Sequence, residues 1–232
     1  MKNLERMLKD IEMEVELTRH LIGKDSLDER VMEAMKQVPR HRFVPHELRY
    51  CAYDNGPVPI GSDQTISQPY IVALMSDLLN LKTDDIVLEI GTGSGYQAAI
   101  LSRLVRQVYS IEIIEDLANK ARDRLIDLNY RNVEVRCSDG YFGWEEHAPY
   151  DGIIITAAAP HIPQPLIKQL REGARLVLPI GLPFRYQELV VIEKKTDGTL
   201  ETREVLGVSF VPLTGQCDTD AQPLGSSRHR LT

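Results

Sequence analysis

The sequence predicts an α/β fold with a doubly wound, mostly parallel sheet, preceded by N-terminal helices and ended by an antiparallel strand pair. Apolar runs alternate with helix-like segments between Asp85 and Ile180, which is typical of parallel strands joined by helices. The first run ends in a carboxylate and is followed by Gly91, Gly93 and Gly95. This strand–turn–helix pattern brings backbone N–H groups close to a ligand. Two later runs flank a turn with no helix between them.

The N-terminal region predicts two helices. Residues 1–22 form an amphipathic helix, because apolar side chains recur at helical spacing among charged ones. These side chains are Leu4, Leu8, Ile11 and Val15. We expect this face to lie on the body of the domain; contact with a second copy is the alternative. A second helix is expected from Ser26 to Val38, with Ser26 and Glu29 as a capping box.

Residues 39–69 contain five prolines and little periodicity. A long irregular segment inside a compact chain is usually functional or disordered, and the apolar residues here favour an ordered, packed segment. Gln68 and Pro69 then open a helix that extends to about Leu79, because proline is tolerated in the first turn.

The core is expected to alternate strands and helices in chain order. The strands are Ile86–Ile90, Gln107–Ile111, Val133–Cys137, Gly152–Thr156 and Arg175–Ile180. The helices are Tyr96–Val105, Glu115–Leu128 and a segment near Pro163–Leu170. The antiparallel pair is Leu189–Glu193 with Val205–Val211. We expect a single domain in which 1–80 packs on a ligand-binding core at 81–215, followed by a polar tail at 216–232.

The composition indicates a globular protein with an acidic balance. The net charge of −7 argues against a nucleic-acid partner, because phosphate binding needs Lys and Arg. Cys51, Cys137 and Cys217 show no pairing pattern, which favours reduced thiols in a reducing compartment. No apolar stretch approaches the ~20 residues that span a bilayer, and the first residues lack a signal-peptide run. We therefore expect a cytoplasmic protein that does not bind a membrane.

Other charged and metal-binding side chains give weaker signals. His41 and His46 are spaced more widely than zinc ligands, so no metal is expected. Three arginines are expected on a solvated face, with a clamp for a substrate carboxylate as the alternative. They are Arg40, Arg42 and Arg49.

The glycine pattern distinguishes between classes of cofactor. A dinucleotide loop reads G-x-G-x-x-G, whereas Tyr96 occupies the third glycine position here. Glu112 ends the second strand, where an acid accepts hydrogen bonds from ribose hydroxyls. Glu89 would repel a pyrophosphate and suits a ligand with an ammonium group. S-adenosyl-L-methionine has that group, a ribose and no phosphate. The alternative for Glu89 is a helix cap or a buried partner for a basic residue.

Asp139 and Gly140 follow the third strand of the core. An acid at that edge of the sheet can accept a hydrogen bond from an adenine amino group. A plain turn is the alternative. The positions of Glu89 and Glu112 on the preceding strands favour the binding role.

These positions, with the run Leu88–Gly95, resemble the S-adenosylmethionine-dependent methyltransferase superfamily. The run Gln64–Tyr70, Gln-Thr-Ile-Ser-Gln-Pro-Tyr, is similar to the signature of the protein-L-isoaspartate (D-aspartate) O-methyltransferase family. Further similar segments are Val38–Pro45, Ala52–Tyr53, Pro57–Gly61, Tyr150–Pro160, Gly173–Gly181 and Phe210–Thr214. The resemblance covers roughly residues 25–215. Asp63 departs from it, since bacterial-type members commonly carry glycine there, and this puts the geometry of the turn in question.

The resemblance implies a Rossmann-like methyltransferase fold and a repair enzyme that uses S-adenosyl-L-methionine and releases S-adenosyl-L-homocysteine. The substrates would be proteins and peptides with L-isoaspartyl, and less well D-aspartyl, residues, methylated on the free α-carboxylate. The ester then cyclises to a succinimide that hydrolyses partly to aspartate. Gln64, Thr65 and Ile66, together with Thr214, would line the cofactor pocket opposite the glycine loop.

Ser67 is the residue expected to orient the acceptor carboxylate by donating a hydrogen bond. A carboxylate is ionised at pH 7 and needs no general base, and no base is placed to make Ser67 a nucleophile. A helix cap is the alternative, and both roles can hold together. The competing functions are a methyltransferase for a small molecule or RNA, which the acidic charge disfavours for RNA, and a binding module without chemistry. We expect a monomer, with a weak dimer as the alternative.

Overall fold

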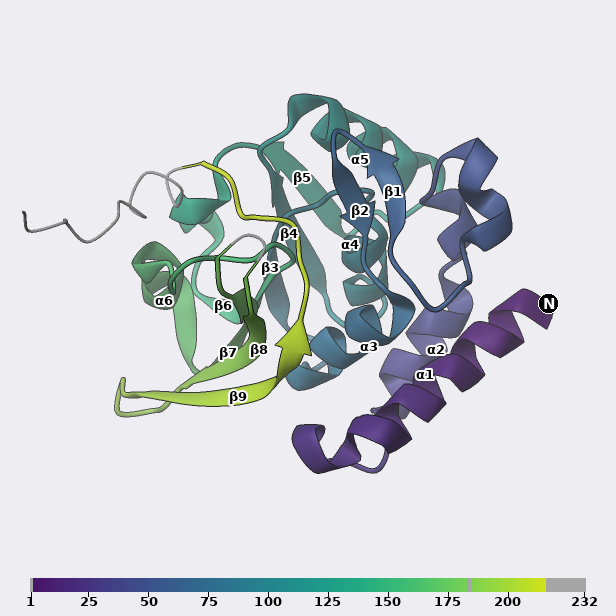
Figure 1. Ribbon diagram of the computed structural model, residues 1–232. Coiled ribbons are helices and arrows are strands. Elements are labelled where there is room, and N and C mark those ends of the chain that lie inside the picture. Colours follow the sequence, from purple (N-terminus) through teal and green to yellow (C-terminus); the bar gives the residue numbers. More distant parts are fainter. Residues whose placement is uncertain (1, 183–184, 216–232) are drawn as a thin grey trace, which may run out of the picture.

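The computed structural model describes residues 2–182 and 185–215, which form a seven-stranded sheet with helices on both faces (Figure 1). The spatial order of the strands is β5-β4-β3-β6-β7-β8-β9. The pairings from β5 to β7 are parallel, and β7–β8 and β8–β9 are antiparallel. In chain order the strands are β3 (Ile86–Ile90), β4 (Gln107–Glu112), β5 (Val133–Cys137), β6 (Tyr150–Ile155), β7 (Leu170–Ile180), β8 (Gln187–Lys194) and β9 (Leu200–Val208). The predicted fold class is confirmed.

The helices divide between the two faces of the sheet. One face carries α1 (Lys2–Ile22), α2 (Glu29–Gln37), α3 (Pro69–Leu78), α4 (Tyr96–Leu101) and α5 (Glu115–Asp127). The other face carries α6 (Gln164–Gln169) and the short 3-10 turns η3 (Gly140–Phe142) and η4 (Glu145–His147). Figure 1 shows α6 on the left of the sheet and α3 and α4 on its right. None of the described helices is long and apolar enough to cross a membrane.

The core forms because successive strand residues point to opposite faces of the sheet. Val87 of β3 joins the hydrophobic cluster beneath α3 and α4, whereas its neighbour Leu88 joins the cluster beneath α6. Both side chains are fully buried. A strand buried on both faces reads as a continuous apolar run, which is why β3 and β6 were recognisable in the sequence.

The start of α2 differs from the expectation. The capping residue is Asp28, whose side chain accepts from the backbone N–H of Arg30 at 2.8 Å, so the predicted capping box at Ser26 is wrong. The N–H of Asp28 donates to Oδ1 of Asp77 at 2.7 Å, and the preceding Leu27 is buried. These contacts with α3 fix the chain at Asp28 and place the first helical turn after it.

The proline-rich segment is ordered, as predicted. It contains η1 (Arg40–Arg42), η2 (His46–Cys51) and the hairpin of β1 (Val58–Gly61) and β2 (Gln64–Ile66). Glu14 of helix α1 contacts the end of this segment: Nε2 of Gln68 donates to Oε1 of Glu14 at 3.4 Å and to Oδ1 of Asn55 at 3.0 Å. The strands β1 and β2 thereby reach the carboxyl edge of the main sheet (Figure 1).

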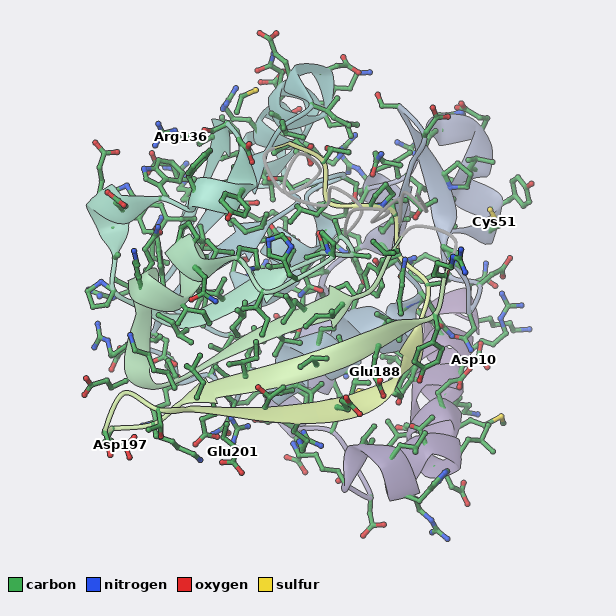
Figure 2. All side chains as sticks on the ribbon, turned by 60° about the vertical axis from the view of Figure 1, so that its left-hand side comes forward. Asp10, Cys51, Arg136, Glu188, Asp197 and Glu201 are labelled. Carbon is green, nitrogen blue, oxygen red and sulfur yellow. The ribbon has the colours of Figure 1, made fainter. Side chains whose placement is uncertain are left out.

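The antiparallel pair at the C-terminal side of the sheet is confirmed with different bounds. Strand β9 begins at Leu200, five residues before the predicted Val205, and pairs with β8 up to Lys194↔Leu200. The early part of β9 is exposed and polar, so it lacks the apolar alternation that marks a strand. Figure 2 shows Asp197 at the tip of this hairpin and Glu188 at the opposite end of β8. The predicted polar tail at 216–232, with Cys217, lies outside the described residues.

The β1–β2 turn places two non-glycine residues in the left-handed region, Ser62 with φ 52° and Asp63 with φ 56°. Left-handed backbone disfavours residues with a Cβ, least so for Asp and Asn. Asp63 therefore adopts the conformation that a glycine would adopt, and the departure from the family pattern preserves the turn. The hairpin stays in place over the glycine loop, where a Cβ on Gly93 would lie 3.4 Å from Cδ1 of Ile60.

Replacing Asp63 tests this turn. We expect Asp63→Gly to keep or raise the free energy of unfolding, by up to about 1 kcal/mol, because glycine adopts positive φ without steric cost. Asp63→Val should lower it by about 1–2 kcal/mol, because a β-branched residue is strained there. Urea titration of both variants measures the difference. Equal destabilisation by the two substitutions would show that the turn does not need left-handed backbone.

Candidate active site

A cleft lies at the carboxyl edge of β3, β4 and β6. Strand order reverses at β3, and ligands bind at such a switch point in doubly wound sheets. The residues predicted for the site that line this cleft are Gln64, Thr65, Ile66, Ser67, Gly91, Gly93, Glu112, Gly140 and Thr214. Gly95, Glu89 and Asp139 do not line it.

The glycine loop is tied to both strands that flank β3. The N–H groups of Gly91 and Thr92 donate to the carbonyl of Ile111 on β4, at 2.8 and 3.2 Å. On the other side, Oγ1 of Thr156 donates to the carbonyl of Gly91 at 2.6 Å. A Cβ on Gly91 would lie 2.4 Å from this Oγ1 and φ is +97°, so the position requires glycine. Gly95, in contrast, begins α4 and faces Leu125 of α5.

Glu112 is held at the end of β4 by two backbone donors. Its Oε2 accepts from the N–H of Gly93 at 2.8 Å, and its Oε1 accepts from the N–H of Ile114 at 3.0 Å. An ionised carboxylate has about four lone-pair sites, so two of them remain for a ligand. The side chain is 6% exposed and lines the cleft. The geometry suits a pair of ribose hydroxyls.

Glu89 lies behind the glycine loop and is fully buried. Its Oε2 accepts a short hydrogen bond from the hydroxyl of Ser110, which also contacts Oγ1 of Thr92 at 2.6 Å. Its Oε1 is buried and has no hydrogen-bond partner among the described residues. No basic residue of the described chain forms an ion pair with it, so the alternative of a buried partner for a base does not hold.

Burial, with a smaller contribution from the nearby charge of Glu112, raises the pKa of Glu89 to about 8, although interactions with the Ser110 hydroxyl and the Ala98 backbone lower it. The carboxyl therefore keeps its proton through most of the neutral range in the absence of a ligand. A cation on the far side of the glycine loop would favour the ionised form. Direct contact of Glu89 with a bound ammonium group stays a prediction.

Asp139 begins η3, and its Oδ1 accepts from the N–H of Tyr141 at 2.9 Å. The following Gly140 lines the cleft, and a Cβ there would lie 2.3 Å from Cγ2 of Ile90. Asp139 therefore forms the turn that was the alternative to a binding role. This turn places Gly140 in the lining of the cleft. A contact between Asp139 and adenine stays a prediction.

A second groove adjoins the first at Ser67. It is bounded by residues from β9 and the segment after it, with Tyr186 and Pro57 at its rim. Thr65, Ser67, Thr156 and Val211 line both cavities. Helix α3 is preceded by Gln68 as its cap, without a side-chain capping bond, so the alternative role of Ser67 as helix cap is wrong. Among the described residues, nothing hydrogen-bonds the Ser67 hydroxyl, which is half-buried.

The expectation that Arg40 lies on a solvated face is wrong. Its side chain is 0% exposed, whereas Arg42 and Arg49 are exposed as predicted. Its Nη2 donates to the carbonyl of Ser67 at 2.6 Å. The segment Pro39–Arg40 gives no periodic signal of burial, and the contact joins residues 27 apart in the chain. Sequence reasoning had no means of finding it.

Several cleft residues were not predicted. They include Thr92, Ser94, Gln97, Ile113, Ile114, Thr156 and Ala157. Thr156 directly follows β6, so its place at the carboxyl end of a strand beside β3 was an available signal. Ile113 is 38% exposed beside Glu112, and an apolar side chain at that position offers a surface for an aromatic base. Within 2–182 and 185–215, no cluster of His, Cys, Asp and Glu could hold a metal ion.

A doubly wound sheet with this glycine loop, a carboxylate at Glu112 on the end of the next strand and a groove beside the cleft defines the class of S-adenosylmethionine-dependent methyltransferases. The family model described as protein-L-isoaspartate(D-aspartate) O-methyltransferase matches residues 12–218. The chain belongs to this family.

Individual relatives agree with this assignment. Protein-L-isoaspartate O-methyltransferase 2 of Nitrosococcus oceani is 62% identical over 216 residues, covering 93% of this chain and 98% of its own. The protein of that name from Syntrophobacter fumaroxidans is 58% identical and covers 90% and 85%. A solved protein-L-isoaspartate O-methyltransferase is similar with a TM-score of 0.79 at 28% identity, over 92% of this chain and 67% of its own. A putative Plasmodium falciparum enzyme, solved with S-adenosyl-L-homocysteine, has a TM-score of 0.72 at 26% identity, over 89% and 97%.

The burial of Glu89 predicts a pH dependence of stability. An acid whose pKa rises on folding takes up a proton between its unfolded and folded pKa values, here 4.5 and about 8. Its contribution to stability is present below the lower value and is lost as pH rises, by on the order of 1 kcal/mol per pH unit. Glu89→Gln removes this slope, so the variant should gain stability relative to the unsubstituted protein as pH rises.

The measurement is urea unfolding of the ligand-free protein at pH 5.5, 6.5 and 7.5. Glu115→Gln, which removes the same charge from the exposed first turn of α5, is the matched control and should leave the pH profile unchanged. Parallel profiles for Glu89→Gln and the unsubstituted protein would contradict a raised pKa at this position.

Proposed function

We propose that this protein transfers a methyl group from S-adenosyl-L-methionine to the free α-carboxylate of L-isoaspartyl, and less well D-aspartyl, residues in damaged proteins and peptides. The observation that carries the proposal is the meeting of two cavities at Ser67. One cavity is lined by the glycine loop and the Glu112 carboxylate, and the other is a groove beside it. A methyl group can pass between ligands only where their sites touch, and this geometry provides that contact.

The donor side fits the cofactor. Gly91 and Gly140 stand where a Cβ would collide with neighbouring side chains, which keeps the backbone close to the cleft. Glu112 would hold the ribose hydroxyls with its remaining lone pairs, and Gln64–Ile66 would cover the ligand from the hairpin. When bound, S-adenosyl-L-methionine supplies an electrophilic methyl group on a sulfonium.

The acceptor side requires alignment more than acid–base chemistry. The acceptor carboxylate is ionised at pH 7, so no residue has to remove a proton from it. Ser67 would donate a hydrogen bond to one carboxylate oxygen and leave the other oxygen facing the donor cavity. Alignment of reacting atoms in this way is worth up to about 7–11 kcal/mol in model reactions.

The groove fits an extended peptide rather than a particular side chain. Its lining includes Gly207–Val211, at the end of β9 and just beyond it. Part of this backbone is already bonded, because Gln187 holds the N–H and the carbonyl of Phe210, and the N–H of Ala158 donates to the carbonyl of Val211. The remaining main-chain groups of the segment would bind a peptide by hydrogen bonds. Recognition through the main chain is compatible with many damaged sequences. After transfer, the methyl ester cyclises spontaneously to a succinimide with loss of methanol, and water opens the succinimide partly to aspartate. A cytoplasmic location and a monomeric state, with a weak dimer as the alternative, remain predictions.

The test is methyl transfer from labelled S-adenosyl-L-methionine to an L-isoaspartyl peptide and to its normal aspartyl twin. We expect label in the isoaspartyl peptide and at most traces in the twin. The label should be released as methanol on mild alkaline treatment, because a methyl ester is labile. Equal labelling of both peptides, or labelling of neither while a small molecule or RNA is labelled, would refute the proposal.

Ser67→Ala separates the acceptor from the donor side. We expect a fall of ten- to a hundredfold in kcat/KM for the isoaspartyl peptide, equivalent to about 1.4–2.7 kcal/mol, because a hydrogen bond to a charged acceptor is lost. The affinity for S-adenosyl-L-homocysteine, measured by calorimetry, should change less than threefold. Ser62→Ala in the exposed turn is the control and should affect neither quantity. A large loss of cofactor affinity in Ser67→Ala would reassign the residue to the donor side.

A further inference from the structure

Arg40 is a buried cation at the back of the acceptor groove. Its side chain is 0% exposed, the largest residue buried to that degree. Nε donates to the carbonyl of Ala52 at 2.7 Å, and Nη2 donates to the carbonyl of Ser67 at 2.6 Å. The guanidinium carbon lies 4.9 Å from the centre of the Tyr96 ring, and Tyr96 lines the cofactor cleft. Arg40 thus contacts Ser67, which lines both cavities, and Tyr96, which lines the cofactor cleft.

No described carboxylate neutralises the charge of Arg40. No carboxylate of the described residues lies within ion-pair distance of it, and the titratable groups beside it are Tyr53 and Tyr96. Its Nη1 is buried and has no hydrogen-bond partner among residues 2–182 and 185–215. Burial lowers the pKa of Arg40 and raises the pKa of Tyr96 to about 12. Arginine nevertheless keeps its proton in proteins, so the described part of the site contains a positive charge without an ion-pair partner.

A buried charge without a partner is costly to fold. Two carbonyls and an aromatic face satisfy part of the guanidinium but leave its net charge in place. The missing anion enters from the substrate in the reaction proposed above, because the acceptor is an ionised carboxylate. It binds at Ser67, whose own carbonyl is bonded to Arg40. The neighbouring groove contributes no other cation, since its described lining residues contain neither Lys nor Arg.

We propose that Arg40 is a positioning residue for methyl transfer that fixes the backbone of Ser67 and supplies the positive charge that makes the acceptor groove select an ionised carboxylate. This inference rests on the proposed function. According to this inference, Arg40, which lines neither cavity, causes the site to prefer an anionic acceptor over a neutral one. Arg40 does not touch the substrate; it acts through the Ser67 peptide group and through its charge.

Arg30 provides a comparison for the purely structural role. Its Nη1 and Nη2 donate to the carbonyls of Leu81 and Leu104 at 2.8 and 2.5 Å, so it also ties two segments together through backbone carbonyls. These contacts join α2 to the far ends of α3 and α4, and neither Arg30 nor its partners line the cofactor cleft or the groove. Arg30 therefore matches Arg40 in bonding to two backbone carbonyls, and it differs from Arg40 in location and in being exposed.

The experiment compares Arg40→Lys, Arg40→Gln and Arg30→Gln. Lysine and glutamine are both shorter than arginine, and only lysine keeps the charge. The probes are an L-isoaspartyl peptide and the same peptide with its free α-carboxylate converted to a carboxamide. Their dissociation constants are measured with S-adenosyl-L-homocysteine bound, and kcat and KM are measured for the isoaspartyl peptide. Circular dichroism and urea unfolding establish that each variant is folded.

We expect the unsubstituted protein to bind the carboxylate at least tenfold more tightly than the carboxamide. Arg40→Gln should reduce this preference at least fivefold, while Arg40→Lys and Arg30→Gln keep it within twofold. The affinity for S-adenosyl-L-homocysteine should stay within threefold in all variants. A rise in KM larger than the fall in kcat is expected for Arg40→Gln, because the charge acts on binding of the anion.

Equal weakening of both peptides by Arg40→Gln, with the preference unchanged, would overturn the inference and leave Arg40 a structural residue. If Arg40→Gln does not fold, the unsubstituted protein and Arg40→Lys still decide: the absence of a carboxylate preference in the former, or its loss in the latter, overturns the inference. Failure of the unsubstituted protein to methylate the isoaspartyl peptide would instead refute the proposed function, so the two failures are distinguishable.

Discussion

The glycine loop after β3 is held in place by hydrogen bonds to both neighbouring strands, and the rest of the site depends on its position. The N–H groups of Gly91 and Thr92 share the carbonyl of Ile111 on β4, and Thr156 after β6 donates to the carbonyl of Gly91. Backbone groups that leave a strand need such partners when they are buried. Because both neighbours are used, the loop turns away from the sheet and opens the cleft in which the cofactor is expected to bind.

An acidic side chain, Glu89, and a basic side chain, Arg40, are buried behind the cleft and the groove, respectively. Among the residues that the structure describes, one oxygen of Glu89, behind the cleft, and one nitrogen of Arg40, behind the groove, have no hydrogen-bond partner. The donor ligand is a cation and the acceptor is an anion, so each group is complementary to the ligand on its own side. Groups of this kind cost stability in the free protein and favour charges that arrive on binding.

Most of the fold was predictable because it is local in sequence. The apolar run before Gly91 and the acid of Glu112 mark the ends of two buried strands, and alternation of strands with helices fixes the sheet topology. The same signals led to Gly91, Gly93 and Glu112, which line the cleft, and to Glu89, Gly95 and Asp139, which do not. Contacts between distant segments were not predictable: the cap of α2 depends on Asp77, and the burial of Arg40 depends on Ser67. Strand β9 began earlier than predicted because an exposed edge strand carries no apolar alternation.

The central claim is that donor and acceptor meet at Ser67, between the cleft and the groove. A crystal structure of the protein with S-adenosyl-L-homocysteine and an L-isoaspartyl peptide tests it most directly. The account predicts the sulfur in the cleft beside the glycine loop, the peptide extended along the groove, and the α-carboxylate within hydrogen-bond distance of the Ser67 hydroxyl, with one oxygen facing the sulfur. A peptide carboxylate bound away from Ser67, or a peptide outside the groove, would contradict the account.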